Sequence, residues 1–446
     1  MFPPYLEIPE IMKNPKDLDA LVLDPSERNP DPFVPGSYFW NPLSLSDGYP
    51  GILLYFSTLQ NKGLLKDKDE QIVHSYVVKI IETIEAQGLS NNLSLFTGVS
   101  GICFAIQSAS MEGKRYGRFL NTLQIFLLNE IGSSYLEPLK KNIRFNRTSS
   151  SSFYDLIQGI SGIGRYAIEN LSDPRFSDLS VEIVKTLSAY IKPLNIDGQQ
   201  VPGWFLSSTD VLNIHGKTNV SKGSFNLGLA HGVPGILSIL SIAALKGVLV
   251  DGQREAIVTA ADWLRKKCLF DNGTIRWPHS ISWEDEFLQQ SPSSHKGCYR
   301  DAWCYGSPGV IRSLFLAGKA LSDQDLKIFA AKAFRDIFFR TRQDWYLPGP
   351  SICHGLAGLL LITKEMAQEK ECTGFFSNID MLTQLLISDY NRDYPFGFKD
   401  VEICRNGSYV KLNKPGLLEG AVGVMLTLLT LKDFKSKWQL PFLIHD

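Results

Sequence analysis

The chain has 446 residues, of which 44% are hydrophobic and 20% charged, and its formal net charge is −1. This composition is typical of a soluble globular protein with a large core, and a charge near zero provides no overall field for nucleic acid or an anionic membrane. The longest uncharged apolar stretch, residues 232–245, is shorter than the ~18–20 residues of a membrane span. Residues 1–20 contain no apolar signal core. We therefore expect a cytoplasmic protein that binds no nucleic acid.

In chain order, the Pro-rich residues 1–40 come first, and we expect them to wrap around the outside of the fold. A Gly-x-x-Gly step followed by an apolar run then occurs seven times, with first glycines 49 to 74 residues apart. The first glycines are Gly48, Gly98, Gly159, Gly232, Gly306, Gly355 and Gly420. Such a repeat is the sequence signature of a repetitive architecture.

The apolar runs, such as residues 236–240 and 424–429, are hydrophobic nearly all round, which is typical of buried helices. The intervening segments, such as 67–86 and 253–267, are amphipathic. Each repeat is therefore predicted to be one helical hairpin, so that seven hairpins give fourteen helices. The prediction is an all-α, α/α toroid: an inner ring of buried helices inside an outer ring of amphipathic ones, in a single domain over 1–446.

Two of the intervals carry extra material rich in Gly, Ser, Trp and His, at 197–225 and 272–299. Both contain short strand-like pieces, at 201–206 and 274–277. We expect loops or small β-ribbons over the active-site end of the toroid, because long loops of this kind are often functional.

Alignment of the seven repeats on their first glycines predicts which residues lie at the same end of the toroid. The residues one position before the glycine are Asp47, Thr97, Gln158, His231, Tyr305, His354 and Glu419. The residues two positions before it are Ser46, Phe96, Ile157, Ala230, Cys304, Cys353 and Leu418. This register predicts that Cys304, Cys353, His354 and His231 cluster, although they are far apart in the sequence.

Two cysteines and a histidine in register form a set of ligands that suits zinc, which favours tetrahedral sulfur and nitrogen coordination. Cys304, Cys353 and His354 would leave the fourth position open, as in catalytic zinc sites. The alternative is that they are ordinary buried cysteines, which are common. The seven cysteines are odd in number and widely spread, so they do not form a disulfide framework. We expect the other five to be ordinary structural cysteines without a metal: Cys103, Cys268, Cys298, Cys372 and Cys404.

Three further residues are candidates for catalysis, each with a structural alternative. His231 suits proton transfer because imidazole titrates near neutral pH, but it would also serve as a fourth ligand, a helix cap or a core residue. Asp155 would orient an imidazole or cap the following helix. Arg300 would stabilise a developing oxyanion or pair with a carboxylate.

The strings Arg300-Asp301-Ala302-Trp303-Cys304-Tyr305-Gly306, Cys353-His354-Gly355 and Ala230-His231-Gly232, together with 416–420, resemble the LanC family of lanthipeptide cyclases. The resemblance runs from about residue 44 to 429 and implies an α/α toroid of seven hairpins that binds one zinc ion. It assigns zinc ligation to Cys304, Cys353 and His354, acid/base positions to His231 and Asp155, and the active-site arginine to Arg300.

The resemblance also implies a reaction and partners. A cysteine of a dehydrated ribosomal precursor peptide adds to dehydroalanine or dehydrobutyrine, which closes a lanthionine or methyllanthionine thioether ring. The protein is expected to be a monomer whose partners are a separate dehydratase and an ABC transporter. A complex with these partners would bring it to the inner face of the membrane. The sequence leaves three alternatives open: a LanC-like enzyme that adds glutathione or another thiol to electrophilic substrates, a zinc-containing peptide-binding scaffold, and a carbohydrate-active toroid with paired acids.

Overall fold

The computed structural model describes residues 3–28, 38–66, 69, 71–210, 222–288, 299–403, 407–431 and 437–446. The chain forms two compact units. The first unit comprises residues 1–127, 347–364 and 374–438, and the second comprises 128–346, 365–373 and 439–446. The predicted single domain stays a prediction. Within the described residues, no helix is long and apolar enough to cross a membrane.

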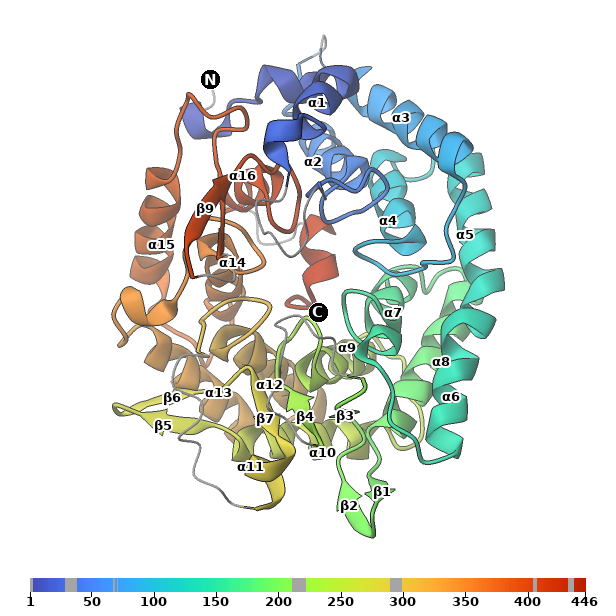
Figure 1. Cartoon of the computed structure of the whole chain (residues 1–446), viewed down its shortest axis with the longest axis vertical. Coiled ribbons are helices and arrows are strands. Elements are labelled where there is room, and N and C mark those ends of the chain that lie inside the picture. Colours follow the sequence, from blue (N-terminus) through green and yellow to red (C-terminus); the bar gives the residue numbers. More distant parts are fainter. Residues whose placement is uncertain are drawn as a thin grey trace. The chain divides into compact units, whose positions relative to one another are not determined.

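Every one of the seven predicted repeats contributes a helix that begins directly after the first glycine of its motif (Figure 1). We call these the motif helices. They are α2 (Tyr49–Asn61), α4 (Val99–Ala109), α7 (Ile160–Ile168), α9 (Val233–Leu245), α12 (Ser307–Leu321), α14 (Leu356–Met366) and α16 (Ala421–Leu429). In the first unit α16 packs against α2 and α2 against α4, and in the second α7 packs against α9 and α9 against α12. The predicted buried helices are thus confirmed.

Six of the motif helices are followed by a return helix. These are α3 (Gln71–Gln87), α5 (Gly117–Ile131), α8 (Pro174–Tyr190), α10 (Gln253–Lys266), α13 (Gln324–Ile337) and α15 (Phe376–Ser388). A π-helical turn, Gly132–Leu136, joins α5 to α6 (Glu137–Arg144). After α16 the described residues contain only a short 3-10 helix, Lys437–Phe442. A second helix of the last hairpin is therefore not seen among the described residues, which omit 432–436.

The N-terminal segment and the insertions form smaller elements. In the first unit α1 (Pro15–Val22) packs against α3. Short antiparallel strands lie in or directly before the two insertions: β1 (Leu194–Ile196) pairs with β2 (Gln199–Val201), and β5 (Leu269–Asp271) with β6 (Thr274–Arg276). A three-stranded sheet has the order β3 (Phe205–Ser207), β4 (Gly223–Asn226), β7 (Ser280–Ser282), and α11 (Trp283–Phe287) follows it. Parts of the predicted wrap and insertions, 29–37, 211–221 and 289–298, lie outside the described residues.

The first glycine of each motif is required because the preceding loop folds back tightly over the start of the helix. At Gly232, a Cβ atom would lie 2.2 Å from the backbone oxygen of Asn226. At Gly306, a Cβ atom would overlap the backbone oxygen of Arg300, and the φ angle of +104° also favours glycine. The first position of the motif is therefore glycine because the loop leaves no room for a Cβ atom there.

Backbone hydrogen bonds join the loops before neighbouring motif helices in the first unit. The N–H of Cys353 donates to the oxygen of Leu418 (2.9 Å), that of Leu418 to Ser46 (3.0 Å), and that of Ser46 to Phe96 (3.0 Å). All four residues stand two positions before a first glycine. Equivalent residues of successive repeats are thus in direct contact, as the register predicts. We call this series of hydrogen bonds the loop ladder.

The second unit has its own part of the loop ladder. The N–H of Leu156 donates to the oxygen of Ala230 (3.1 Å), and the N–H of Ala230 donates to the oxygen of Cys304 (3.3 Å). Ala230 and Cys304 occupy the predicted register, whereas Leu156 lies one residue before it. The ladder therefore places the residues before α7, α9 and α12 side by side.

Residues 439–446 are held inside the second unit by buried polar side chains. The Arg312 guanidinium donates through Nε to the oxygen of Ile444 at 2.7 Å. The Trp303 indole donates to the oxygen of Phe442 at 3.0 Å. Both side chains are fully buried, so these backbone oxygens have their hydrogen bonds satisfied away from water.

The first prediction concerns this anchoring. Arg312 also forms an ion pair with Glu369 at 3.0 Å. We expect Arg312→Ala to destabilise the protein by about 1–3 kcal/mol, because the buried carbonyl of Ile444 loses its donor, whereas Glu369 keeps Lys319 as a partner at 3.3 Å. Thermal unfolding of this variant and of the exposed Arg254→Ala control measures the loss. Equal melting temperatures for the two variants would contradict the anchoring role.

Candidate active site

In the second unit, Asp155 and His231 form a close hydrogen-bonded pair. His231 Nδ1 donates to Asp155 Oδ2 at 2.6 Å, and the Asp155 side chain is fully buried. The other carboxylate oxygen accepts the backbone N–H groups of Gln158 (2.6 Å) and Gly159 (3.0 Å) at the start of α7. Asp155 therefore fixes the turn that leads into α7 and holds the imidazole of His231, but it does not cap α7, whose N-cap is Gly159.

His231 is positioned for exchange with solvent or substrate. Its side chain is 25% exposed, so it is not a core histidine, and Nε2 is the ring nitrogen that Asp155 does not engage. Burial lowers the pKa of His231, but the hydrogen bond and charge of Asp155, together with the charge of Cys304, outweigh burial and raise the pKa above its usual value. The ring thus carries a proton more readily than a free histidine does.

Cys304 and Tyr305 lie next to this pair through the loop ladder. Cys304 is buried, and the Tyr305 ring lies 6.4 Å from the His231 ring. The Tyr305 hydroxyl accepts a hydrogen bond from Asn226 at 3.0 Å, and its ring lies 5.2 Å from that of His279. Sequence reasoning placed Tyr305 in the register without a role. It missed Asn226 and His279, which come from β4 and from the residue before β7 and carry no motif.

Arg300 is half-buried, and none of the described residues forms an ion pair with it. The sequence alternative for Arg300 was an ion pair with a carboxylate. Among the described residues, the ion pair in this loop is formed by the neighbouring Asp301 with Arg340. Asp301 is buried and accepts two hydrogen bonds from Arg340 Nη1, at 2.7 and 2.5 Å. Burial raises the pKa of Asp301, and Arg340 opposes that rise. Asp301 therefore holds the loop before α12, while the predicted role of Arg300 stays a prediction.

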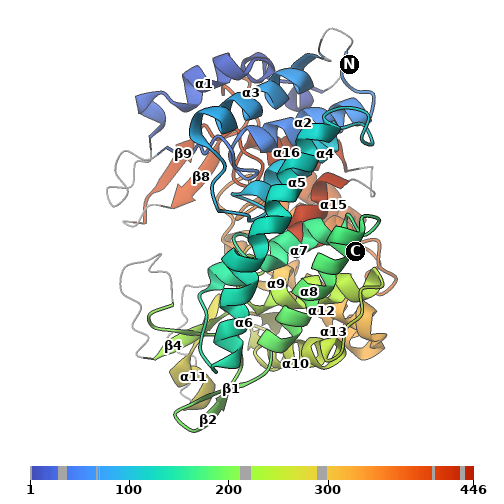
Figure 2. The ribbon, with the colours of Figure 1, turned by 90° about the vertical axis from the view of Figure 1, so that its right-hand side faces the viewer.

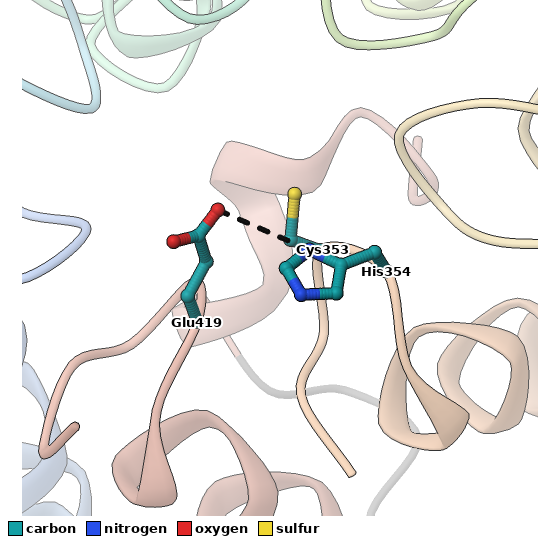
Figure 3. Close-up of side chains that lie close together, drawn as sticks. All are labelled: Cys353, His354 and Glu419. Atoms are coloured by element: carbon teal, nitrogen blue, oxygen red, sulfur yellow. Dashed lines mark ion pairs between the residues drawn. The ribbon is translucent and has the colours of Figure 1, made fainter. Parts of the chain in front are cut away.

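In the first unit, Cys353, His354 and Glu419 point their side chains toward a common space (Figure 3). One ligand atom from each lies within 4.8 Å of the others, which is close enough for the three to hold a metal ion. His354 Nδ1 is 3.9 Å from Glu419 Oε1. The loop ladder produces this arrangement, because Cys353 hydrogen-bonds to Leu418, which precedes Glu419.

A buried lysine adjoins this group. Lys414 Nζ lies 3.1 Å from Asp400 Oδ2, 2.5 Å from Glu402 Oε1 and 3.1 Å from Glu419 Oε2. Burial lowers the pKa of Lys414, but the charges of Glu419, Asp400 and Glu402 outweigh burial and raise the pKa well above its usual value. Lys414 in turn lowers the pKa of Glu419. Asp400 Oδ1 lies 3.7 Å from His354 Nε2.

Sequence reasoning missed Asp400 and Lys414. Asp400 begins strand β8 (Asp400–Ile403), and Lys414 follows strand β9 (Tyr409–Leu412), with which β8 pairs (Figure 2). The strands are short and no motif marks them, so no local signal connects this hairpin with Cys353 and His354.

The predicted ligands are thus distributed over both units. Cys353 and His354 belong to the first unit, and Cys304 belongs to the second. Among the other cysteines, Cys103, Cys268 and Cys372 form no disulfide. Cys298 and Cys404 lie outside the described residues.

Comparison with known proteins identifies the family. The family profile described as lanthionine synthetase C-like protein matches residues 39–443, which is most of the chain. The chain belongs to this LanC-like family. The nisin biosynthesis protein NisC of Lactococcus lactis subsp. lactis is 26% identical over 363 residues, which cover 80% of this chain and 82% of NisC.

A solved structure of nisin cyclase resembles this LanC-like chain with a TM-score of 0.71. The match has 23% sequence identity and covers 91% of this chain and 93% of the cyclase. This likeness shows a shared fold and confirms the predicted fold class, the all-α toroid of the family.

The second prediction concerns the pair of Asp155 and His231. In Asp155→Asn we expect the pKa of His231 to fall by about one unit or more, because the amide lacks the charge that stabilises the imidazolium. The amide oxygen of asparagine can still accept the N–H groups of Gln158 and Gly159, so the turn before α7 is expected to remain formed. An NMR titration of the histidine ring signals measures the change. The other histidines serve as internal controls, and an unchanged His231 titration would contradict the assignment.

Proposed function

We propose that this LanC-like chain is a zinc-dependent cyclase that forms lanthionine and methyllanthionine rings. It adds cysteine thiols of a ribosomal precursor peptide to dehydroalanine or dehydrobutyrine in the same peptide. The observation that carries the proposal is the hydrogen-bonded pair of Asp155 and His231 beside Cys304, in a chain that belongs to this family over residues 39–443.

The residues of the first unit fit a zinc ion. A thiol, an imidazole and a carboxylate within 4.8 Å of one another are the donor types that zinc takes in proteins. We propose Cys353 and His354 as two ligands and Cys304 as the third, which rests on the repeat register and the family motif. Zinc bound there would supply the peptide sulfur as a thiolate at neutral pH, because a coordinating thiol is deprotonated.

The protein's own residues complete the reaction. As the thiolate sulfur bonds to the β-carbon, the double-bond electrons move toward the carbonyl oxygen of the peptide. Protonated His231 then delivers its Nε2 proton to the α-carbon, and Asp155 holds the imidazolium through Nδ1. Arg300 stabilises the negative charge on the enolate oxygen. The hydrogen lost by the thiol is thus balanced by the hydrogen gained at the α-carbon.

The dehydrated precursor peptide is the proposed substrate, and NisC, named for nisin biosynthesis, is the relative that supports it. From the family resemblance we also propose a monomer that works with a separate dehydratase and an ABC transporter at the inner face of the membrane. This assembly would deliver the dehydrated peptide to the cyclase and remove the ring-containing product.

The alternatives make different products or none. A thiol-adding LanC-like enzyme would join glutathione to the substrate, which increases its mass, whereas ring closure leaves the mass of the peptide unchanged. A peptide-binding scaffold would have no need for the raised pKa of His231. Membership in the LanC-like family decides against a carbohydrate-active toroid.

The third prediction tests the proton donor. We expect His231→Ala to slow ring closure by about 10²–10⁴-fold, the usual contribution of general acid catalysis, while zinc content is unchanged. The substrate is a peptide that contains one cysteine and one dehydroalanine. Alkylation of the remaining thiols followed by mass spectrometry measures closure. A wild-type rate in this variant would contradict the role of His231.

A further inference from the structure

We propose that Asp400 is a positioning residue for His354: it accepts the Nε2 hydrogen of the imidazole and thereby directs Nδ1 toward the metal. Lys414 holds Asp400 in place for this purpose. The inference rests on the proposed zinc function and adds a residue that neither the sequence motifs nor the repeat register include.

The two nitrogens of His354 face different surroundings. On the Nδ1 side lie Glu419, 38% exposed and 3.9 Å away, and the thiol group of Cys353 (Figure 3). On the Nε2 side lies Asp400, whose side chain is completely buried, at 3.7 Å. His354, Asp400 and Glu402 also lie close enough together to hold a metal ion, but the Lys414 ammonium already pairs with both carboxylates. The Nδ1 side is therefore the one open to a metal, and Asp400 occupies the enclosed side.

The chemistry of metal-bound histidine requires such a partner. An imidazole that gives one nitrogen lone pair to a metal carries hydrogen on the other nitrogen, and that N–H is usually donated to a carboxylate or carbonyl. The 3.7 Å separation exceeds a hydrogen bond by about 0.5 Å or more. A small rotation of the ring closes this gap, and metal coordination favours the rotation because it makes the opposite N–H a stronger donor.

Lys414 holds the buried carboxylate of Asp400 in a fixed orientation. Its ammonium lies 3.1 Å from Asp400 Oδ2, so the other oxygen, Oδ1, is the one that faces His354. The pairing of β8 with β9 matches Asp400 with Leu412, two residues before Lys414, which places the two charges together. An ion-paired carboxylate with one oxygen directed at the ring is suited to fix its tautomer.

Zinc affinity tests the inference with a matched control. We expect Asp400→Asn to weaken zinc binding about 10–100-fold, the usual effect of removing a carboxylate behind a metal-bound histidine. Competition with a chromophoric chelator measures the dissociation constant. Glu402→Gln is the control, because it removes a charge from the same lysine, which Glu402 contacts at 2.5 Å, and leaves the Asp400 carboxylate in place. We expect its affinity to stay within about threefold of the wild type.

The tautomer provides a readout that a purely structural role would not change, and it needs no variant. In zinc-loaded wild-type protein with ¹⁵N-labelled histidine, long-range ¹H–¹⁵N spectra are expected to show His354 coordinated through Nδ1 and protonated at Nε2. Coordination through Nε2, or equal zinc affinity in Asp400→Asn and wild type, would overturn the inference alone. Equal losses in Asp400→Asn and Glu402→Gln would also overturn it. Wild-type protein that binds no zinc would overturn the proposed function and this inference with it.

Discussion

Backbone hydrogen bonds between equivalent loop residues are the constraint on which the candidate site depends. In the loop ladder, the N–H groups of Cys353 and Ala230 each donate to the corresponding residue of the next repeat in their unit. Each such bond contributes only about 0.5–1.5 kcal/mol net, but an unmade one in a buried loop costs more. Because the ladder uses only backbone atoms, the side chains at these positions are free to be cysteine, alanine, serine, phenylalanine or leucine. A repetitive scaffold can therefore carry chemistry at a few repeats only.

Buried charges in the site are compensated in pairs, and each pair fixes an imidazole. Asp155 receives two backbone N–H groups and His231, so its charge is satisfied while its orientation of the ring is fixed. In the first unit Lys414 compensates Asp400 and Glu419, which face the two nitrogens of His354. Each histidine thus has a buried carboxylate next to one ring nitrogen, Asp155 at Nδ1 of His231 and Asp400 at Nε2 of His354. The backbone that positions each carboxylate therefore sets the orientation of the imidazole ring.

The sequence predicted those features that repeat or that sterics impose. All seven motif helices begin where the glycines indicate, because the loops approach the helix starts too closely for a side chain. The register aligned Cys353, His354 and Glu419, which lie together in the first unit. The sequence separately suggested Asp155 as a residue that would orient an imidazole, and it contacts His231. Asp400 and Lys414 were not predictable, because a short hairpin without a motif brings them to the site.

Zinc content tests the central claim most directly, namely that register alone identifies a metal site. Elemental mass spectrometry would be applied to the wild type, to Cys304→Ala and to Cys268→Ala, the last being a cysteine outside the register. The account predicts one zinc per chain in the wild type and in Cys268→Ala, and a loss of zinc in Cys304→Ala. Folded wild-type protein without zinc, or full zinc content in Cys304→Ala, would contradict it.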